Sequence, residues 1–293
     1  TGKWWMHYGS FFGGLYCVEL DPETGLPAEE GDQGHLTARR ANYQKDNLEA
    51  PEIIYNPDLK QYYLFVSYDP LMTTYNVRVG RSDKAEGPFV DFSGVELKDT
   101  TNNFPILTAP YRFHPGWAGT AHCSVFTSDE GQYFMAHQGR LSPHNQMMDL
   151  HLRQVFFTPD GWPVVSPERY TGSVSRKFSA EDMVGEWEVI RIQEPAYERR
   201  LQAGQILWGE GQLKEEEWNV SHLLSLEKNG HLGENKGNWE FLEAKQLLSL
   251  TLEGEIINNL IIFAGHDWEN EKETVLFTGL DSRGRAIWGK RIK

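Results

Sequence analysis

One glutamate, Glu49, combines a carboxyl group with a fixed place in the chain. It stands two residues before Pro51, which fixes its own φ angle and favours an extended Ala50. The apolar run that follows predicts a strand, then a turn at 56–58 and a return strand at 62–68. A carboxylate at the mouth of such a hairpin could be the acid of an enzyme that cleaves glycosidic bonds. The alternative is a solvated glutamate at the end of a strand.

His122 is the second side chain whose type and position could support chemistry. It opens a predicted strand, 121–127, directly after a loop that contains Gly119. An imidazole there could bind a metal ion or act in catalysis, and it could equally be a structural histidine. A zinc site is not expected, because the histidines nearest in the sequence do not follow a His-x-x-x-His pattern. These are His114, His137, His144 and His151.

The composition excludes some classes of partner. A formal net charge of −14 disfavours nucleic acid, because a phosphate backbone would be repelled. No apolar run approaches the roughly 20 residues needed to cross a bilayer, so no membrane partner is expected. Aromatic residues make up 13% of the chain, with ten Trp, which suits β-sheet cores and the stacking of rings on sugars. Cys17 and Cys123 are expected to be buried free thiols.

The order of strands and turns predicts an all-β protein with two parts. Hairpins recur up to residue 165, which is typical of the blades of a β-propeller, although a sandwich has similar spacing. The composition changes near 172–175, and the boundary is therefore set between 1–174 and 175–293. The second part is expected to be a small closed barrel whose last strand seals an edge. Its strands are expected at 184–190, 205–208, 218–224, 239–243, 247–252, 259–263, 274–280 and 286–290.

Several short motifs occur in order and together resemble one known family. They are YGSFFGG at 8–14, EAPEI at 49–53, YYLFVS at 62–67, VRVGRS at 77–82 with GPF at 87–89, and HCSV at 122–125. This series resembles the endo-arabinanases of glycoside hydrolase family 43. The segments LRQV at 152–155 and GWPVVSPERY at 161–170 are similar to the members that carry a C-terminal β-barrel.

The resemblance implies a fold and a reaction. The fold would be a five-bladed propeller that hydrolyses α-1,5-linked arabinofuranose chains with inversion, using three carboxylates. Glu49 matches the general acid. The base and a second aspartate that tunes the acid lie, in the family, upstream of Thr1, and Asp21, Asp32 and Asp69 are not put forward in their place. The chain is therefore expected to be the C-terminal portion of an enzyme, completed by an N-terminal fragment.

The resemblance also implies a metal, a substrate loop and a location. His122 corresponds to a central histidine beside a Ca²⁺ ion that is coordinated mostly by water, and Cys123 stands where many relatives have Asn. Ser10, Phe11, Phe12 and Gly13 would contact arabinan or an arabino-oligosaccharide, although the two aromatic rings could instead pack in a blade core. An enzyme of this kind would be secreted.

Two other functions remain open at this point. One is a propeller that binds carbohydrate without cleaving it, with the barrel as its accessory part. The other is a different family 43 activity on the same ring, such as an arabinofuranosidase or a xylosidase. The tryptophans of the barrel could bind polysaccharide or pack in its core. These are Trp187, Trp208, Trp218, Trp239, Trp268 and Trp288.

Overall fold

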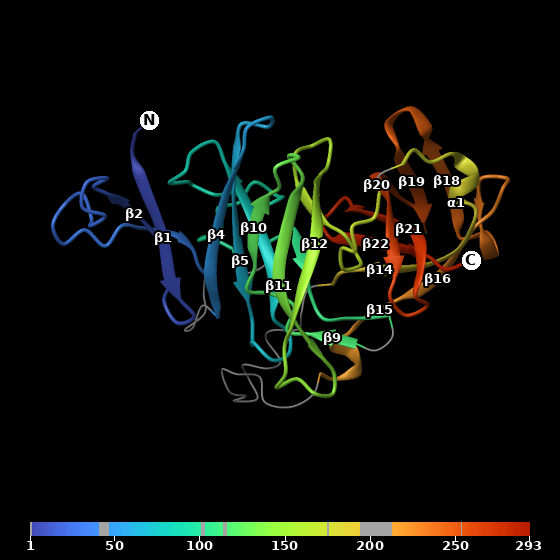
Figure 1. Cartoon of the computed structure of the whole chain (residues 1–293), viewed down its shortest axis with the longest axis horizontal. Helices are drawn as coiled ribbons and strands as arrows, with labels where there is room; N and C mark the ends of the chain where they lie inside the picture. Colours follow the sequence, from blue (N-terminus) through green and yellow to red (C-terminus); the bar gives the residue numbers. More distant parts are fainter. Residues whose placement is uncertain are drawn as a thin grey trace.

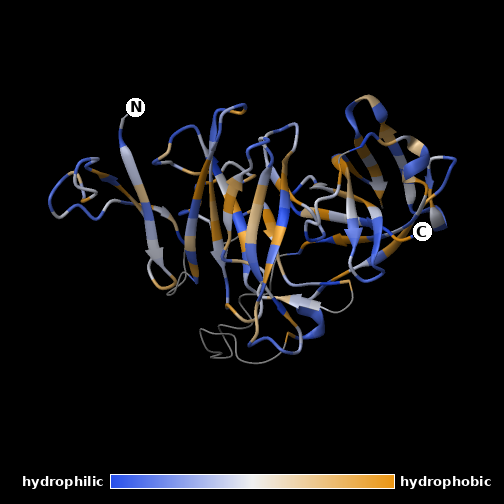
Figure 2. Ribbon diagram, in the orientation of Figure 1, coloured by the Kyte–Doolittle hydropathy of each residue, from blue (hydrophilic) through white to orange (hydrophobic). Residues whose placement is uncertain are grey.

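The computed structural model of the chain is an all-β protein, and the part that it describes contains one short α-helix. It describes residues 2–40, 47–100, 103–113, 116–174, 176–193, 213–252 and 254–293. Three sheets lie side by side, and a barrel follows at the C-terminal end (Figure 1). Apolar residues are concentrated along the strands, whereas the connecting loops are mainly hydrophilic (Figure 2). Within the described residues, no helix is long and apolar enough to cross a membrane.

The first two sheets carry the motifs that precede residue 110. The first sheet contains β1 (Trp4–Ser10), β2 (Gly14–Leu20) and β3 (His35–Ala38) in that order. The second contains β4 (Leu48–Asn56), β5 (Gln61–Tyr68), β6 (Asn76–Ser82) and β7 (Ile106–Thr108). The predicted β4–β5 turn is present, because Asn56 Oδ1 accepts hydrogen bonds from the main-chain nitrogens of Asp58 and Leu59 at 3.0 and 3.1 Å. This hairpin carries Glu49.

The third sheet contains strands from both parts of the chain. Its order is β13-β12-β11-β9-β8-β15, and β10 pairs with β11. The strands are β8 (Tyr111–Arg112), β9 (Gly116–Ala118), β10 (Ser124–Thr127), β11 (Tyr133–Leu141), β12 (Asp149–Phe157), β13 (Pro163–Val165) and β15 (Asn219–Val220). The strand expected at 218–224 is therefore divided, because β15 pairs in parallel with β8 while the next residues enter the barrel.

The barrel is closed by eight strands. They are β14 (Gly185–Arg191), β16 (His222–Leu226), β17 (His231–Leu232), β18 (Gly237–Leu242), β19 (Leu247–Leu252), β20 (Glu255–Asp267), β21 (Lys272–Leu280) and β22 (Ala286–Arg291). Helix α1 (Ala180–Met183) precedes it, and short 3-10 helices lie at Glu215–Glu217, Gly233–Asn235 and Glu243–Lys245. Because β22 pairs with β14, the prediction that the last strand seals the barrel is confirmed. The strand expected at 205–208, with Trp208, lies outside the described residues.

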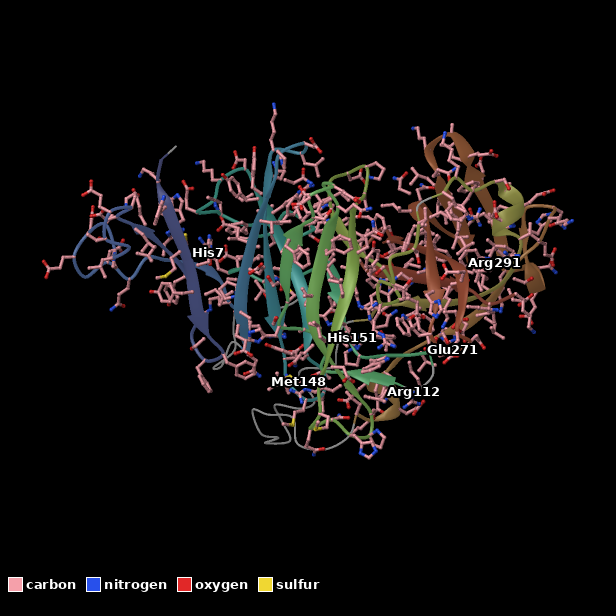
Figure 3. The ribbon with its side chains drawn as sticks, viewed as in Figure 1. His7, Arg112, Met148, His151, Glu271 and Arg291 are labelled. Atoms are coloured by element: carbon pink, nitrogen blue, oxygen red, sulfur yellow. The ribbon has the colours of Figure 1, made fainter. Side chains whose placement is uncertain are left out.

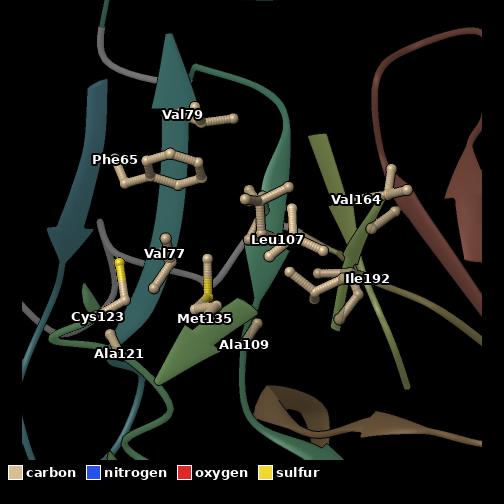
Figure 4. Packing of buried hydrophobic residues seen from close by; sticks show 14 of the residues in the cluster. Phe65, Val77, Val79, Leu107, Ala109, Ala121, Cys123, Met135, Val164 and Ile192 are labelled. Carbon is tan, nitrogen blue, oxygen red and sulfur yellow. The ribbon is translucent and has the colours of Figure 1, made fainter. Parts of the chain in front are cut away.

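The outer wall of the barrel is buried against the third sheet. Trp288 of β22 meets the ring of Tyr111 edge-on at 5.3 Å, and the Arg153 guanidinium lies over both rings. Ile192 belongs to the same hydrophobic cluster and lies near Leu107 and Val164 (Figure 4). One hydrophobic cluster therefore extends across both parts, while the barrel also has a cluster of its own. Ser175 lies outside the described residues, so the boundary at 174/175 stays a prediction.

A buried lysine also joins the barrel to the segment before it. The Lys290 ammonium lies 2.5 Å from Glu269, 3.0 Å from Glu168, 3.2 Å from Asp267 and 3.5 Å from Glu188. Burial raises the pKa of the Glu168 carboxyl to about 7, although Lys290 acts in the opposite direction. Burial alone would lower the pKa of Lys290, but the surrounding carboxylates raise it well above its usual value. We call these five side chains the Lys290 cluster.

Candidate active site

A bulge in β4 sets the direction of Glu49. Glu49 pairs with Ser67 of β5, and the next pair is Glu52 with Phe65, so two residues oppose one at this point. Ala50 lies in the bulge with a φ of 54°. The expectation of an extended Ala50 is therefore wrong. The bulge gives Ala50 a positive, left-handed φ angle just before the proline. Bulges re-aim side chains at functional sites, and Glu49 is half-buried there.

Tyr75 contacts both predicted site residues. Its hydroxyl donates a hydrogen bond to Glu49 Oε1 at 2.6 Å and lies 3.3 Å from His122 Nδ1. Tyr75 is fully buried. Burial raises the pKa of its phenol far above the usual value, and the hydrogen bond and charge of Glu49 raise it further. The structure therefore brings Glu49 and His122 to one phenol oxygen that keeps its proton.

Tyr75 was not found from the sequence. It directly precedes β6, and no motif or spacing distinguishes it from the other eleven tyrosines. Its relation to Glu49 depends on a contact between residues 26 positions apart. A sequence pattern does not report a contact of this kind.

His122 lies two residues before β10 and is exposed. Its main-chain nitrogen donates to Ser67 Oγ at 2.9 Å, which fixes it beside the β4–β5 hairpin. The next side chain, Cys123, points instead into the hydrophobic cluster (Figure 4). Burial raises the pKa of the Cys123 thiol, and the charge of Glu52 raises it further. The thiol is therefore neutral and is directed into the core rather than toward solvent with His122.

Four residues around the site adopt left-handed backbone angles. Asn47, Ala50, Asp69 and His122 have φ angles of 47°, 54°, 75° and 55°. Residues other than glycine rarely adopt such angles, which cost on the order of 1–3 kcal/mol each and cluster at functional sites. Asp69 N donates to Asn47 O at 2.9 Å, so two of the strained residues are bonded to each other.

The aromatic turn between β1 and β2 is hydrogen-bonded to the chain just before Glu49. Asn47, two residues before Glu49, donates its main-chain N–H to Phe11 O at 2.9 Å. Phe11 is half-buried, whereas Phe12 is 54% exposed. Core packing therefore does not account for Phe12. Ser10 and Gly13 complete the turn, in which Gly13 N donates to Ser10 O at 3.4 Å.

Asp21, Asp32 and Asp69, which the sequence does not support as catalytic residues, have structural roles. Asp69 is fully buried, pairs with Arg40 and accepts a hydrogen bond from Asn76 Nδ2 at 2.6 Å. Asp21 and Asp32 accept hydrogen bonds from main-chain nitrogens two residues ahead, at 2.8 and 2.7 Å, in exposed loops. The carboxylate of each is therefore engaged in a structural contact.

Two buried histidines, His137 and His151, belong to strands of the third sheet. His137 Nε2 accepts a hydrogen bond from Arg153 Nε at 2.9 Å. Burial and the Arg153 charge lower the pKa of His137 to about 3, and burial also lowers that of His151. In Figure 3, His151 lies between His7 at one end of the molecule and Arg291 in the barrel. Both imidazoles are therefore neutral.

Two family models match almost the whole chain. The glycosyl hydrolases family 43 model matches residues 1–163, and a C-terminal lipocalin-like domain model matches residues 167–289. The extracellular endo-alpha-(1->5)-L-arabinanase 2 of Bacillus subtilis is 27% identical over 99% of this chain. The extracellular endo-alpha-(1->5)-L-arabinanase of Thermotoga petrophila is 29% identical over 100% of it. In both cases the chain spans only 62% of the relative.

Solved structures agree with these matches. The crystal structure of the Thermotoga petrophila endo-1,5-alpha-L-arabinanase superposes with a TM-score of 0.81 at 27% identity, over 100% of this chain and 65% of that one. A family 43 protein from Bacillus licheniformis gives a TM-score of 0.83 at 24% identity, which shows a shared fold. The family 43 model covers more than half of the chain. The chain therefore belongs to the glycosyl hydrolases of family 43.

Proposed function

We propose that this chain is the C-terminal portion of an inverting endo-arabinanase that hydrolyses the α-1,5-L-arabinofuranosidic bonds of arabinan or arabino-oligosaccharides. The observation that carries the proposal is the meeting of Glu49 and His122 at Tyr75, beside the exposed Phe12. Relatives that match the whole chain are named endo-arabinanases. Because those relatives are named extracellular, we also propose that the protein is secreted.

In this proposal Glu49 is the general acid. It gives its proton to the glycosidic oxygen while a water molecule attacks the opposite face of the sugar. An inverting pair needs its two carboxyl groups roughly 6.5–9.5 Å apart, so that this water fits between base and sugar. Ser10, Phe11, Phe12 and Gly13 would form the wall along which the substrate lies, with Phe12 offering its exposed ring.

The base and the second aspartate would come from a complementary N-terminal portion of the same enzyme. The chain spans less than two thirds of the relatives that it matches. The three sheets would then be blades of a five-bladed propeller, which the complementary portion would close. Residues 1–174 would belong to this propeller and residues 175–293 to the accessory barrel. We call this chain together with that portion the assembled protein.

Calcium is proposed as the cofactor, with His122 as its contact. Ca²⁺ prefers six to eight oxygen ligands. Among the described residues, the only grouping of three metal-binding side chains is Glu168, Asp267 and Glu269, and Lys290 lies among them. An ion beside His122 would therefore take one imidazole from this part of the chain and complete its shell largely with water. The exposed ring of His122 fits that limited role.

Removing the ion should lower both activity and the melting temperature of the assembled protein. A ligand present at 100 times its Kd stabilises the folded state by about 3 kcal/mol, so chelation should produce a clear shift in thermal unfolding, and added Ca²⁺ should reverse it. His122→Ala should abolish the response. His222→Ala, which changes an exposed barrel histidine, should leave it intact. An unchanged melting temperature after chelation would refute the metal site.

The reaction itself is tested by following the anomer released from linear α-1,5-arabinan. The assembled protein should first release β-anomeric reducing ends in oligosaccharides of mixed length, as seen by ¹H NMR within the first minutes. Release of arabinose alone would indicate an arabinofuranosidase, and xylose from xylan a xylosidase. Binding of arabinan without new reducing ends would indicate a carbohydrate-binding propeller.

A further inference from the structure

Tyr75 has one hydroxyl proton, and its oxygen lies beside the side chains of Glu49, His122 and Ser67. Glu49 Oε1 lies 2.6 Å from Tyr75 Oη, and His122 Nδ1 lies 3.3 Å from it. Hydrogen bonds to a carboxylate are shorter and about twice as strong as neutral ones. The shorter distance and the acidic partner therefore assign the proton to the bond with Glu49.

This assignment fixes the tautomer of His122. The phenol oxygen has given its proton away, so it can take part in the second contact only as an acceptor. His122 Nδ1 must then carry a hydrogen, and Nε2 of the neutral ring keeps its lone pair. The three groups form a directed chain from His122 Nδ1–H through Tyr75 Oη–H to Glu49 Oε1.

We propose that Tyr75 is the positioning residue of the catalytic acid: it holds Oε1 of Glu49 and thereby leaves the transferable proton on Oε2. This inference rests on the proposed function. When Oε1 accepts the tyrosine hydrogen bond, a protonated Glu49 carries its own hydrogen on the other oxygen, which is the one left for the substrate. Glu49 remains the acid that donates the proton, and Tyr75 acts only by orienting the Glu49 carboxyl group.

The same hydrogen bond also serves the step that follows. The proton of Oε2 passes to the glycosidic oxygen, the bond between that oxygen and the anomeric carbon breaks, and its electron pair stays with the oxygen of the leaving alcohol. Glu49 becomes a carboxylate. Tyr75 then donates to a full negative charge, so the bond strengthens as the reaction proceeds. An interaction that is stronger in the transition state raises kcat rather than lowering KM.

The tyrosine is held firmly enough for this role. Its ring is fully buried, and its main-chain nitrogen donates to Pro70 O at 3.1 Å. The rings of Tyr75 and His122 lie 6.5 Å apart between centroids. Ser67, which pairs with Glu49 in the sheet, also holds the main chain of His122 at 2.9 Å. The donor therefore has little freedom to turn away from the carboxyl group.

Tyr75→Phe tests the proposal because it removes only the hydroxyl. In the assembled protein, kcat on arabinan should fall about 10- to 100-fold, the range for a hydrogen bond to a charged group, with KM nearly unchanged. An aryl arabino-oligosaccharide with a good leaving group needs less protonation, so its kcat should fall much less. Tyr63→Phe is the matched control, because Tyr63 is also fully buried and donates to Gly161 O at 2.6 Å. It should not alter the ratio of the two rates.

A second measurement uses the chain without catalysis. In the presence of a chelator and at alkaline pH, ¹⁵N-detected NMR should show hydrogen on Nδ1 of the His122 ring. Tyr75→Phe should move the ring toward the Nε2–H form, while the other histidines keep their tautomers. Hydrogen on Nε2 in the unmodified chain, or equal losses on both substrates in Tyr75→Phe, would overturn the proposal.

The outcomes separate this inference from the proposed function. If Glu49→Gln inactivates the assembled protein while Tyr75→Phe behaves like the unmodified protein, only the role of Tyr75 is refuted. If the unmodified assembled protein does not cleave arabinan, the proposed function is refuted, and the catalytic role assigned to Tyr75 fails with it. The NMR measurement still decides whether the hydrogen bonds run in the proposed direction.

Discussion

Replacing Glu49 by glutamine should lower kcat on arabinan by about 100- to 10,000-fold, the usual contribution of a general acid. Glutamine has nearly the same shape, and its amide oxygen can still accept the hydrogen bond from Tyr75 that Oε1 accepts in the unmodified protein. It has no proton of suitable acidity to give to the leaving oxygen. Folding should therefore be preserved while the chemical step is lost, as measured by initial rates and thermal unfolding of the assembled protein.

A control for this change lies on the same strand. Glu52 Oε1 accepts hydrogen bonds from Ser124 Oγ and Val125 N, both at 2.9 Å, and so connects β4 to β10. Glu52→Gln keeps that acceptor and should leave kcat within a few-fold of its original value. An aryl substrate with a good leaving group should rescue much of the rate of Glu49→Gln. Rates near the original on both substrates would remove Glu49 from the mechanism.

Replacing Lys290 by methionine should lower the free energy of unfolding by about 3–5 kcal/mol, the usual cost of breaking a buried ion pair. The ammonium is shared by Glu168, Glu188, Asp267 and Glu269. Without it these carboxylates repel one another, and two of them, Glu168 and Asp267, are buried. Lys272→Met is the control, because Lys272 donates to a main-chain oxygen at an exposed position. It should change stability by less than about 0.5 kcal/mol; an equal loss in both variants would refute the role of the cluster.

The pH dependence of unfolding gives the same prediction a second readout. The Glu168 pKa of about 7 lies above the 4.5 that is usual for a glutamate. The stability linked to this proton is therefore fully present below about pH 4.5 and is lost as the pH rises through about 7. The change is on the order of 3 kcal/mol. Glu168→Gln should flatten this part of the curve, and the penalty of Lys290→Met should be smaller at pH 5 than at pH 8.

The local elements could be predicted because their signals are local. The turn at Asn56 needs only an asparagine side chain that reaches nitrogens two and three residues ahead. Barrel closure was predicted from evenly spaced alternating strands, and β22 does pair with β14. Glu49 and His122 were found because each begins a short motif. The left-handed Ala50 was missed, because a bulge depends on how two strands are paired.

The parts that were missed are contacts between distant residues. Tyr75 gains its role only from the positions of Glu49 and His122. The Lys290 cluster joins residues as far apart as Glu168 and Lys290. Neither charge pattern nor periodicity reports that these side chains share one buried space. The exposed ring of Phe12 likewise depends on where the β1–β2 turn lies against its neighbours.

Strand β15 prevents the barrel from acting as an interchangeable domain, because it is part of the third sheet. Asn219–Val220 adds to the edge of the third sheet, and the neighbouring Trp218 packs on Gly116, where a Cβ would lie 2.6 Å from the indole ring. A cut at residue 175 would remove this strand and leave the β8 edge unpaired. A graft of the barrel onto another propeller would need a host with a glycine at the position of Gly116 and an unpaired strand edge at the position of β8. Exchange of this barrel is thus restricted to propellers that offer the same strand edge and the same glycine.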